Sequence, residues 1–178
     1  DNIPKYFPPK TFDCNKELDD KGNHDWSGFL YNAKKLNLYQ DTTFSVYYRL
    51  LYYGNYMAII EVYKNFDNYI LAIDSLANDN KLYRQINTVI SKKNLSRIDS
   101  LDILSGQFFK IRSYENCYDD NKFLSIDDRD NWVIEIKKQN KYHAIERTLA
   151  EENVARFIKI IMDIGNMHQY HIYRSDKK

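Results

Sequence analysis

Histidine is the residue type in this sequence whose spacing comes closest to that of a metal site. His168 and His171 lie three positions apart, and His143 precedes Glu146 by three. Metal sites use such spacing when further ligands converge on the same point. The sequence contains no His-Glu-x-x-His motif and no cysteine pair that would complete a ligand set. We therefore expect surface or partly packed histidines, with no bound metal and no other cofactor.

Acidic residues gather between positions 118 and 130, in a segment rich in turn-forming side chains. A calcium loop needs alternating oxygen ligands, a central glycine and a terminal glutamate, and this segment has no glycine. We interpret the segment as a solvated acidic rim that meets a basic partner. The residues that this hypothesis assigns to binding are Tyr118, Asp119, Asp120, Asp127, Asp128, Asp130 and, from a neighbouring strand, Tyr142.

Nucleophilic catalysis has no recognisable signature in the chain. There is no Gly-x-Ser-x-Gly elbow, and Ser105-Gly106 falls inside a predicted helix. Cys14 and Cys117 lie far apart in sequence, which indicates one disulfide in an exported protein or two inert buried thiols in a cytosolic one. We favour the disulfide. The missing signatures lead us to predict a protein that is not an enzyme.

A β-hairpin followed by a helix is the clearest structural pattern in the chain. Residues 132–147 form two alternating runs around a polar turn. With a two-residue turn, Trp132 would lie opposite Arg147 and Ile136 opposite His143. The period of two then assigns Trp132 and Arg147 to one face of the sheet.

The register of the hairpin remains open. Gln139 is a poor residue for a turn that needs positive φ, so a longer loop in a different register is an alternative.

The role of the hairpin residues also has two interpretations. In the structural reading, Trp132 packs against the helices while Arg147 stacks on its edge or caps a helix end. In the catalytic reading, Glu135, His143 and Arg147 are the residues of an enzyme of unfamiliar family.

The hairpin also carries a resemblance. It resembles the signature W-[IV]-[IV]-E…YH…R of a group of uncharacterised bacterial proteins, many of them exported, through Trp132-Val-Ile-Glu135, Tyr142-His143 and Arg147. Residues 26–36 are similar to the early helix of that group, and residues 46–61 to its central strand pair. Ile136 departs from the pattern, because the group often has glycine there. The resemblance implies the order of elements and an export history. The group has no established activity, so the resemblance implies nothing about a reaction.

The remaining pattern predicts an α+β fold with the order α-β-β-β-β-α-β-β-α. Residues 1–24 contain all three prolines and are expected to form an extended or partly disordered arm, before a single domain at 25–178. Short turns between successive strands favour a mainly antiparallel sheet of about five to seven strands, with three helices on one face. The predicted helices lie near 26–36, 96–111 and 150–165, and the predicted strands near 43–53, 56–63, 69–74, 83–91 and in the hairpin.

Composition excludes some partners and suggests others. The 178 residues include 26 Lys and Arg against 25 Asp and Glu, so no net field draws in nucleic acid. No run approaches the roughly 18 apolar residues of a transmembrane segment. The 16 tyrosines reflect either an AT-rich coding genome or a protein-recognition surface, which tyrosine suits.

These observations favour a non-enzymatic module that binds a protein partner. Its most concrete form is an immunity protein that neutralises a secreted bacterial toxin, since such a protein needs only a rigid scaffold and a complementary surface. The alternatives are a small-ligand carrier with a cavity between sheet and helices, and the enzyme described above. The sequence starts at Asp1, which suggests processing. We therefore expect an exported protein, periplasmic or on the outer surface, with a cytoplasmic location as the alternative.

Overall fold

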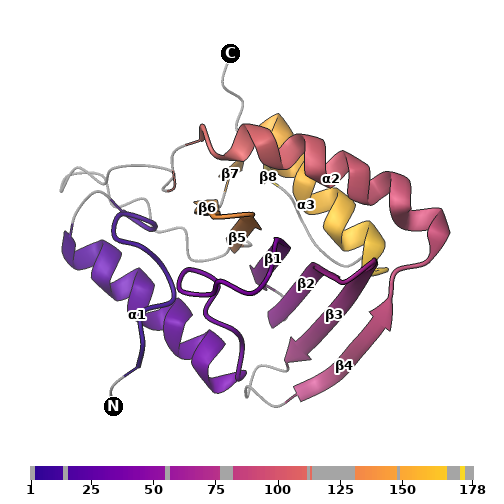
Figure 1. Ribbon diagram of the computed structural model, residues 1–178. Helices are drawn as coiled ribbons and strands as arrows, with labels where there is room; N and C mark the ends of the chain where they lie inside the picture. The colour runs from indigo at the N-terminus through magenta and orange to yellow at the C-terminus, as the bar shows by residue number, and fades with distance from the viewer. Residues whose placement is uncertain are drawn as a thin grey trace.

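An antiparallel sheet of six strands lies at the centre of the fold, with strand order β4-β3-β2-β1-β5-β6 (Figure 1). The computed structural model describes residues 3–13, 16–54, 57–76, 82–111, 113, 131–147, 149–167 and 173–174. The sheet comprises β1 (Val46–Tyr53), β2 (Met57–Asn65), β3 (Asn68–Leu76), β4 (Leu82–Val89), β5 (Asn131–Lys138) and β6 (Lys141–Arg147). A short parallel pair is formed by β7 (Leu149–Ala150) and β8 (Tyr173–Arg174).

Three α-helices accompany the sheet: α1 (Lys16–Asn32), α2 (Leu95–Phe108) and α3 (Glu152–Ile164), with a 3-10 turn (Lys92–Asn94) before α2. The predicted α+β class and element order are confirmed. Among the described helices, none has the length and apolarity that crossing a membrane would require.

The larger core lies between the sheet and the pair of helices α2 and α3. Phe157 of α3 contacts both Tyr48 of β1 and Phe108 of α2, and Trp132 of β5 packs on Tyr52 at 4.5 Å between ring centroids. Trp132 therefore packs in the helix-covered core, as the structural reading of the hairpin requires.

A second core lies on the opposite face of the sheet, where α1 packs (Figure 1). The prediction that all helices share one face is therefore wrong. The central strands are apolar on both sides: Leu51 and Ile59 face α1, whereas Leu50 and Ile60 face α2 and α3. Near-continuous apolar runs are typical of strands buried on both faces, and both faces then need a cover.

The N-terminal residues belong to this second core, and α1 begins at Lys16, inside the segment predicted to be an arm. Tyr6, Phe7 and Phe12 are all buried. A helix was predicted near 26–36, but its start at Lys16 was missed because the face that meets these residues is polar: Asp19, Asn23 and Ser27 are spaced by four and are all buried.

The polar face of α1 binds the backbone of the preceding segment. Asp19 accepts hydrogen bonds from the amides of Lys10 and Phe12 at 2.7 and 2.8 Å. Asn23 Nδ2 donates to the Phe7 carbonyl at 2.9 Å, and Ser27 Oγ accepts from the Tyr6 amide at 3.0 Å. Side chains thus replace the ladder bonds that an irregular buried segment lacks.

The hairpin register is confirmed, with Trp132 opposite Arg147 and Ile136 opposite His143. The turn has two residues, as predicted, and Gln139 adopts the positive φ of 55° that makes it an unusual choice there. Its amide donates to the Ser45 carbonyl at 2.6 Å, so a hydrogen bond to a residue outside the hairpin offsets the cost of the positive φ.

Candidate functional site

The α1-facing side of the sheet carries ionised side chains among apolar ones. Arg49 of β1 pairs directly with Glu135 of β5 and with Glu61 of β2, so the three form one row across three strands. Arg49 Nη1 donates to Glu135 Oε2 at 2.8 Å, and Arg49 Nε donates to Glu61 Oε1 at 2.8 Å. Neither Arg49 nor Glu135 is exposed at all, and Glu61 is 3% exposed.

Lys35 extends this row from the end of α1. Its ammonium lies 2.7 Å from Glu61 Oε2 and 2.5 Å from Asp74 Oδ2 of β3. We call Lys35, Arg49, Glu61, Asp74 and Glu135 the charged cluster. It alternates in sign, since each cation lies between two carboxylates.

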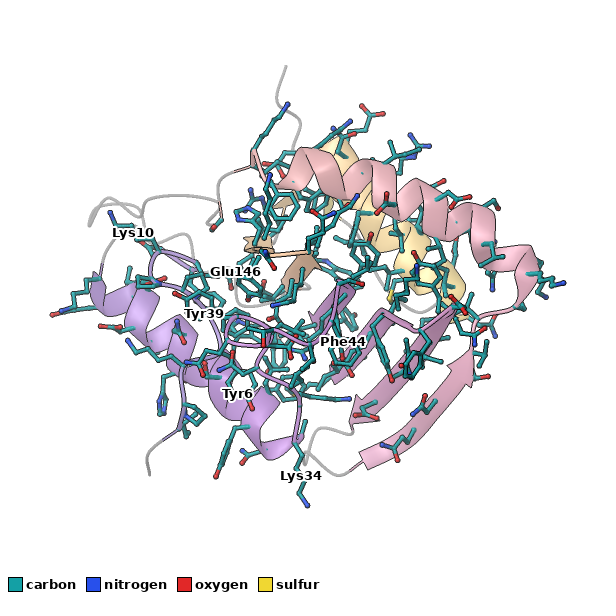
Figure 2. All side chains as sticks on the ribbon, viewed as in Figure 1. Tyr6, Lys10, Lys34, Tyr39, Phe44 and Glu146 are labelled. Carbon is teal, nitrogen blue, oxygen red and sulfur yellow. The ribbon has the colours of Figure 1, made fainter. Side chains whose placement is uncertain are left out.

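The end of α1 delivers Lys35 to the cluster through a tight backbone turn. The Lys35 amide donates to the Leu30 carbonyl at 2.9 Å and the Lys34 amide to the Tyr31 carbonyl at 3.0 Å, the two bonds of a Schellman motif. Lys34 has a φ of 55°, a left-handed conformation in which this motif usually places glycine. Lys34 is exposed and lies beyond the end of α1 (Figure 2).

Two tyrosine hydroxyls complete the hydrogen bonds of the carboxylates. Tyr142 donates to Glu135 Oε1 at 2.8 Å and Tyr47 donates to Glu61 Oε1 at 2.9 Å. Burial, together with the adjacent carboxylates, raises the pKa of both phenols, so both remain protonated donors.

The ionised groups titrate according to burial and partners. Burial acts to lower the pKa of Arg49, but Glu135 and Glu61 outweigh it and raise that pKa; the same balance of burial against Glu61 and Asp74 raises the pKa of Lys35. Burial acts to raise the pKa of Glu61, but Arg49 and Lys35 outweigh it and lower that pKa. For Glu135, burial dominates and raises the pKa despite Arg49, because Glu135 has one cation where Glu61 has two.

Buried cations also fix the segment that connects α1 to β1. Arg49 Nη2 donates to the Leu36 carbonyl at 2.7 Å. Lys137, which is 5% exposed, donates from Nζ to the carbonyls of Leu38 and Asp41. The positive charges therefore satisfy backbone carbonyls that have no sheet partner, and they hold residues 35–41 against the sheet.

Two open pockets adjoin the charged cluster and share Lys34, Asp74 and Gln85 in their walls. The larger pocket, of about 580 Å³, lies between α1 and the sheet, with Phe29 on one side and Met57 on the other. The smaller pocket, of about 240 Å³, includes Glu61 and Tyr63. We call the two together the α1 groove.

The α1 groove is open because α1 leaves part of the sheet uncovered. Gln85 and Asn87 of β4 are exposed and pair with Asp74 and Ala72 of β3, on the side of the sheet that faces α1. Farther along the same face, Val89 is 56% exposed. At this end of the groove, Tyr47 and Tyr63 stack at 4.9 Å between centroids and Phe44 meets both edge-on.

The structure separates the residues that the catalytic reading grouped. Glu135 faces α1, whereas His143 and Arg147 lie on the face of the sheet covered by α2 and α3, next to Ile136 and Trp132. Successive strand residues point to opposite faces, so these three side chains cannot meet in one site. Of the predicted site residues on the hairpin, Glu135 and Tyr142 lie on the face of the sheet that carries the charged cluster.

His143 and Arg147 have structural partners on their own face. His143 Nε2 lies 2.8 Å from the Ile111 carbonyl, and burial lowers its pKa. Arg147 bonds the Ser113 carbonyl at 2.9 Å and Glu151, the N-cap residue of α3, at 3.0 Å. Arg147 therefore lies beside the start of α3 and pairs with the carboxylate of Glu151.

Several predicted residues lie outside the described residues: Tyr118, Asp119, Asp120, Asp127, Asp128, Asp130, His168, His171 and both members of the predicted disulfide, Cys14 and Cys117. Across the portion of the chain that is described, no three His, Cys, Asp or Glu side chains gather closely enough to hold a metal ion.

The sequence contained a signal for the charged cluster. Arg49, Glu61 and Asp74 each interrupt an apolar strand, and buried charges in such positions need partners. Which partner each has depends on strand order, which the pattern did not supply.

Comparison with protein-family models, with curated proteins and with solved structures finds no match.

Proposed function

We propose that the chain is a non-enzymatic module that binds a protein partner, and that the α1 groove receives a segment of that partner. The observation that carries this proposal is that α1 leaves uncovered the side of β3 and β4 that faces it. Gln85 and Asn87 are exposed there, beside the buried Asp74. A single face thus offers amides, a carboxylate and the aromatic group of Phe44, Tyr47 and Tyr63. Such mixtures suit protein recognition, in which aromatic anchors combine with polar rims.

The scaffold around the groove supports the same proposal. The charged cluster ties α1 and the segment 35–41 to the central strands, so the walls of the groove are held before a partner arrives. A preorganised surface binds with less loss of conformational entropy.

An immunity protein that neutralises a secreted bacterial toxin is the most concrete form of this proposal, with export to the periplasm or outer surface as part of it. What supports it is the absence of a recognised catalytic signature in the sequence, together with a rigid groove. The natural partner to test is the product of the gene next to the one that encodes this chain.

Titration calorimetry with that purified product tests the proposal. Gln85→Arg places a bulky cation in both pockets and should weaken binding at least about tenfold, the loss expected for a side chain at the centre of an interface. Gln107→Arg is the matched control, because Gln107 is an exposed glutamine on α2, across the sheet. Absence of binding would remove the immunity form. Binding with equal losses in the two variants would remove the groove as the contact surface.

A small-ligand carrier is the second candidate, and the volume of the larger pocket favours it. About 580 Å³ lies within the range of roughly 300–1,000 Å³ typical of small-molecule sites. The pocket lies between the sheet and α1, and it is open to solvent. A carrier would retain its ligand during purification, so native mass spectrometry of the purified chain separates the two candidates.

A further inference from the structure

We propose that the larger pocket of the α1 groove binds the cationic side chain of an arginine or lysine presented by the partner, an inference that rests on the proposed function. The pocket combines two carboxylates, Asp25 and Asp74, with apolar walls. A long aliphatic stem that ends in a cation matches both features, since such side chains bury the stem and keep the charge at a polar tip.

The charge of the groove favours a cation. Its two pockets contain three carboxylates, from Asp25, Glu61 and Asp74, against two ammonium groups, from Lys34 and Lys35. The remaining buried pair, Arg49 and Glu135, is balanced. Three negative charges against two positive charges leave one negative charge in the groove, which one incoming cation would neutralise.

The position of Asp74 determines where that cation would lie. Asp74 is 6% exposed and yet lines both pockets, so this residue lies deep in the groove, where the two pockets adjoin. Lys35 bonds it through Oδ2 at 2.5 Å and is shared with Glu61, so a single ammonium serves two carboxylates. Asp25 lies at the rim, since its side chain is exposed on α1.

The walls of the pocket fit an aliphatic stem. Ile3, Phe29 and Met57 supply apolar surface from the N-terminal segment, from α1 and from β2. Gly28 keeps the α1 side open, because it presents no side chain where it faces Ile3. A purely polar ligand would leave these apolar groups wet, whereas an arginine or lysine would cover them.

The experiment uses N-acetyl-L-arginine methylamide as a probe and the neutral citrulline analogue as its matched control. Binding is followed by NMR of methionine methyl groups in the full chain. Met57 lines the pocket, and Met162, which is fully buried in α3, serves as the internal reference. The arginine probe should shift the Met57 methyl saturably, the citrulline analogue should not, and Met162 should stay unchanged.

Asp25→Asn removes a carboxylate from the exposed rim without disturbing the core, and it should weaken binding of the arginine probe about fivefold. Asp99→Asn, an exposed aspartate on α2, is the control and should leave binding unchanged. Equal binding of both probes, an unmoved Met57, or no effect of Asp25→Asn would each overturn the inference.

Failure of this inference is distinguishable from failure of the proposed function. If the partner still loses affinity with Gln85→Arg while the arginine probe does not bind, the groove binds protein without a cation in the pocket. If the probe binds through Asp25 while Gln85→Arg leaves partner binding intact, the proposed function is wrong and the pocket serves a cationic small molecule.

Discussion

The guanidinium of Arg49 lies 2.8 Å from the carboxylate of Glu135 on the neighbouring strand, and neither side chain has any exposure to solvent. The same guanidinium bonds Glu61 and the Leu36 carbonyl. Arg49, on β1, therefore connects β2 and β5 to the segment that follows α1. The rigidity that we attribute to the α1 groove depends on this side chain.

Replacing Arg49 should destabilise the chain strongly. Arg49→Met leaves Glu135 buried without a cation, and loss of one partner of a buried ion pair costs about 3–5 kcal/mol of unfolding free energy. Urea denaturation measures this loss. Arg156→Met, at an exposed position on α3, is the control and should have little effect. A loss below about 1 kcal/mol, the range of an exposed ion pair, would contradict the role given to Arg49.

Glu61 should make stability depend on pH on the acid side. Burial acts to raise its pKa, but Arg49 and Lys35 outweigh burial and lower it. The folded chain thus binds this proton less readily than the unfolded chain. The stabilisation is complete above the unfolded pKa of about 4.5 and is lost as the pH falls through the folded-state value.

Glu61→Gln should therefore remove part of the acid dependence. The difference in unfolding free energy between the wild type and this variant should shrink as the pH falls from about 6 to about 3. Urea denaturation at each pH measures it, with Glu152→Gln on the exposed side of α3 as the control. A difference that stays constant over this range would show that the charge of Glu61 contributes nothing.

Gly22 and Gly106 should respond in opposite ways to alanine. A Cβ at Gly22 would lie 2.8 Å from Cβ and Cγ of Phe12, and these atoms cannot move without the backbone. Gly22→Ala should destabilise by about 1–3 kcal/mol through overpacking, although alanine is the better helix former. Gly106 has nothing within 4 Å, so Gly106→Ala should stabilise by about 0.5–1 kcal/mol. Thermal unfolding of the pair tests this, and stabilisation by both substitutions would refute the close packing of Phe12 on α1.

Asp19 should control the attachment of the N-terminal segment. Its carboxylate accepts hydrogen bonds from the backbone amides of Lys10, Phe12 and Asp13, so Asp19→Ala should release residues 6–12. The neighbouring Asp20 pairs with Lys5 at 2.9 Å on the exposed side of the helix, and Asp20→Ala should change little. Limited proteolysis measures the difference as faster cleavage before α1. Equal cleavage of the two variants would count against the anchoring role of Asp19.

The sequence pattern predicted the features of the fold that depend on residues close together in the chain. The hairpin register followed from alternation and a two-residue turn, and Trp132 opposite Arg147 is confirmed. The start of α1 could not be predicted in this way, because its buried stripe of Asp19, Asn23 and Ser27 is polar and its function is to bond backbone groups.

The charged cluster depends on contacts that no local pattern specifies. Arg49 and Glu135 are 86 positions apart, and they meet because β5 pairs with β1 on the side opposite β2. Alternation could place both residues on some face of some strand. Only the strand order makes them neighbours, and only the second helical layer makes their face buried.

Hydrogen–deuterium exchange of the complex between this chain and its partner tests the central claim most directly. Binding in the α1 groove should slow exchange in residues 82–89 of β4 and in the C-terminal half of α1, and it should leave α2 and α3 unchanged. Protection confined to α2 and α3, with β4 exchanging as in the free chain, would contradict the account.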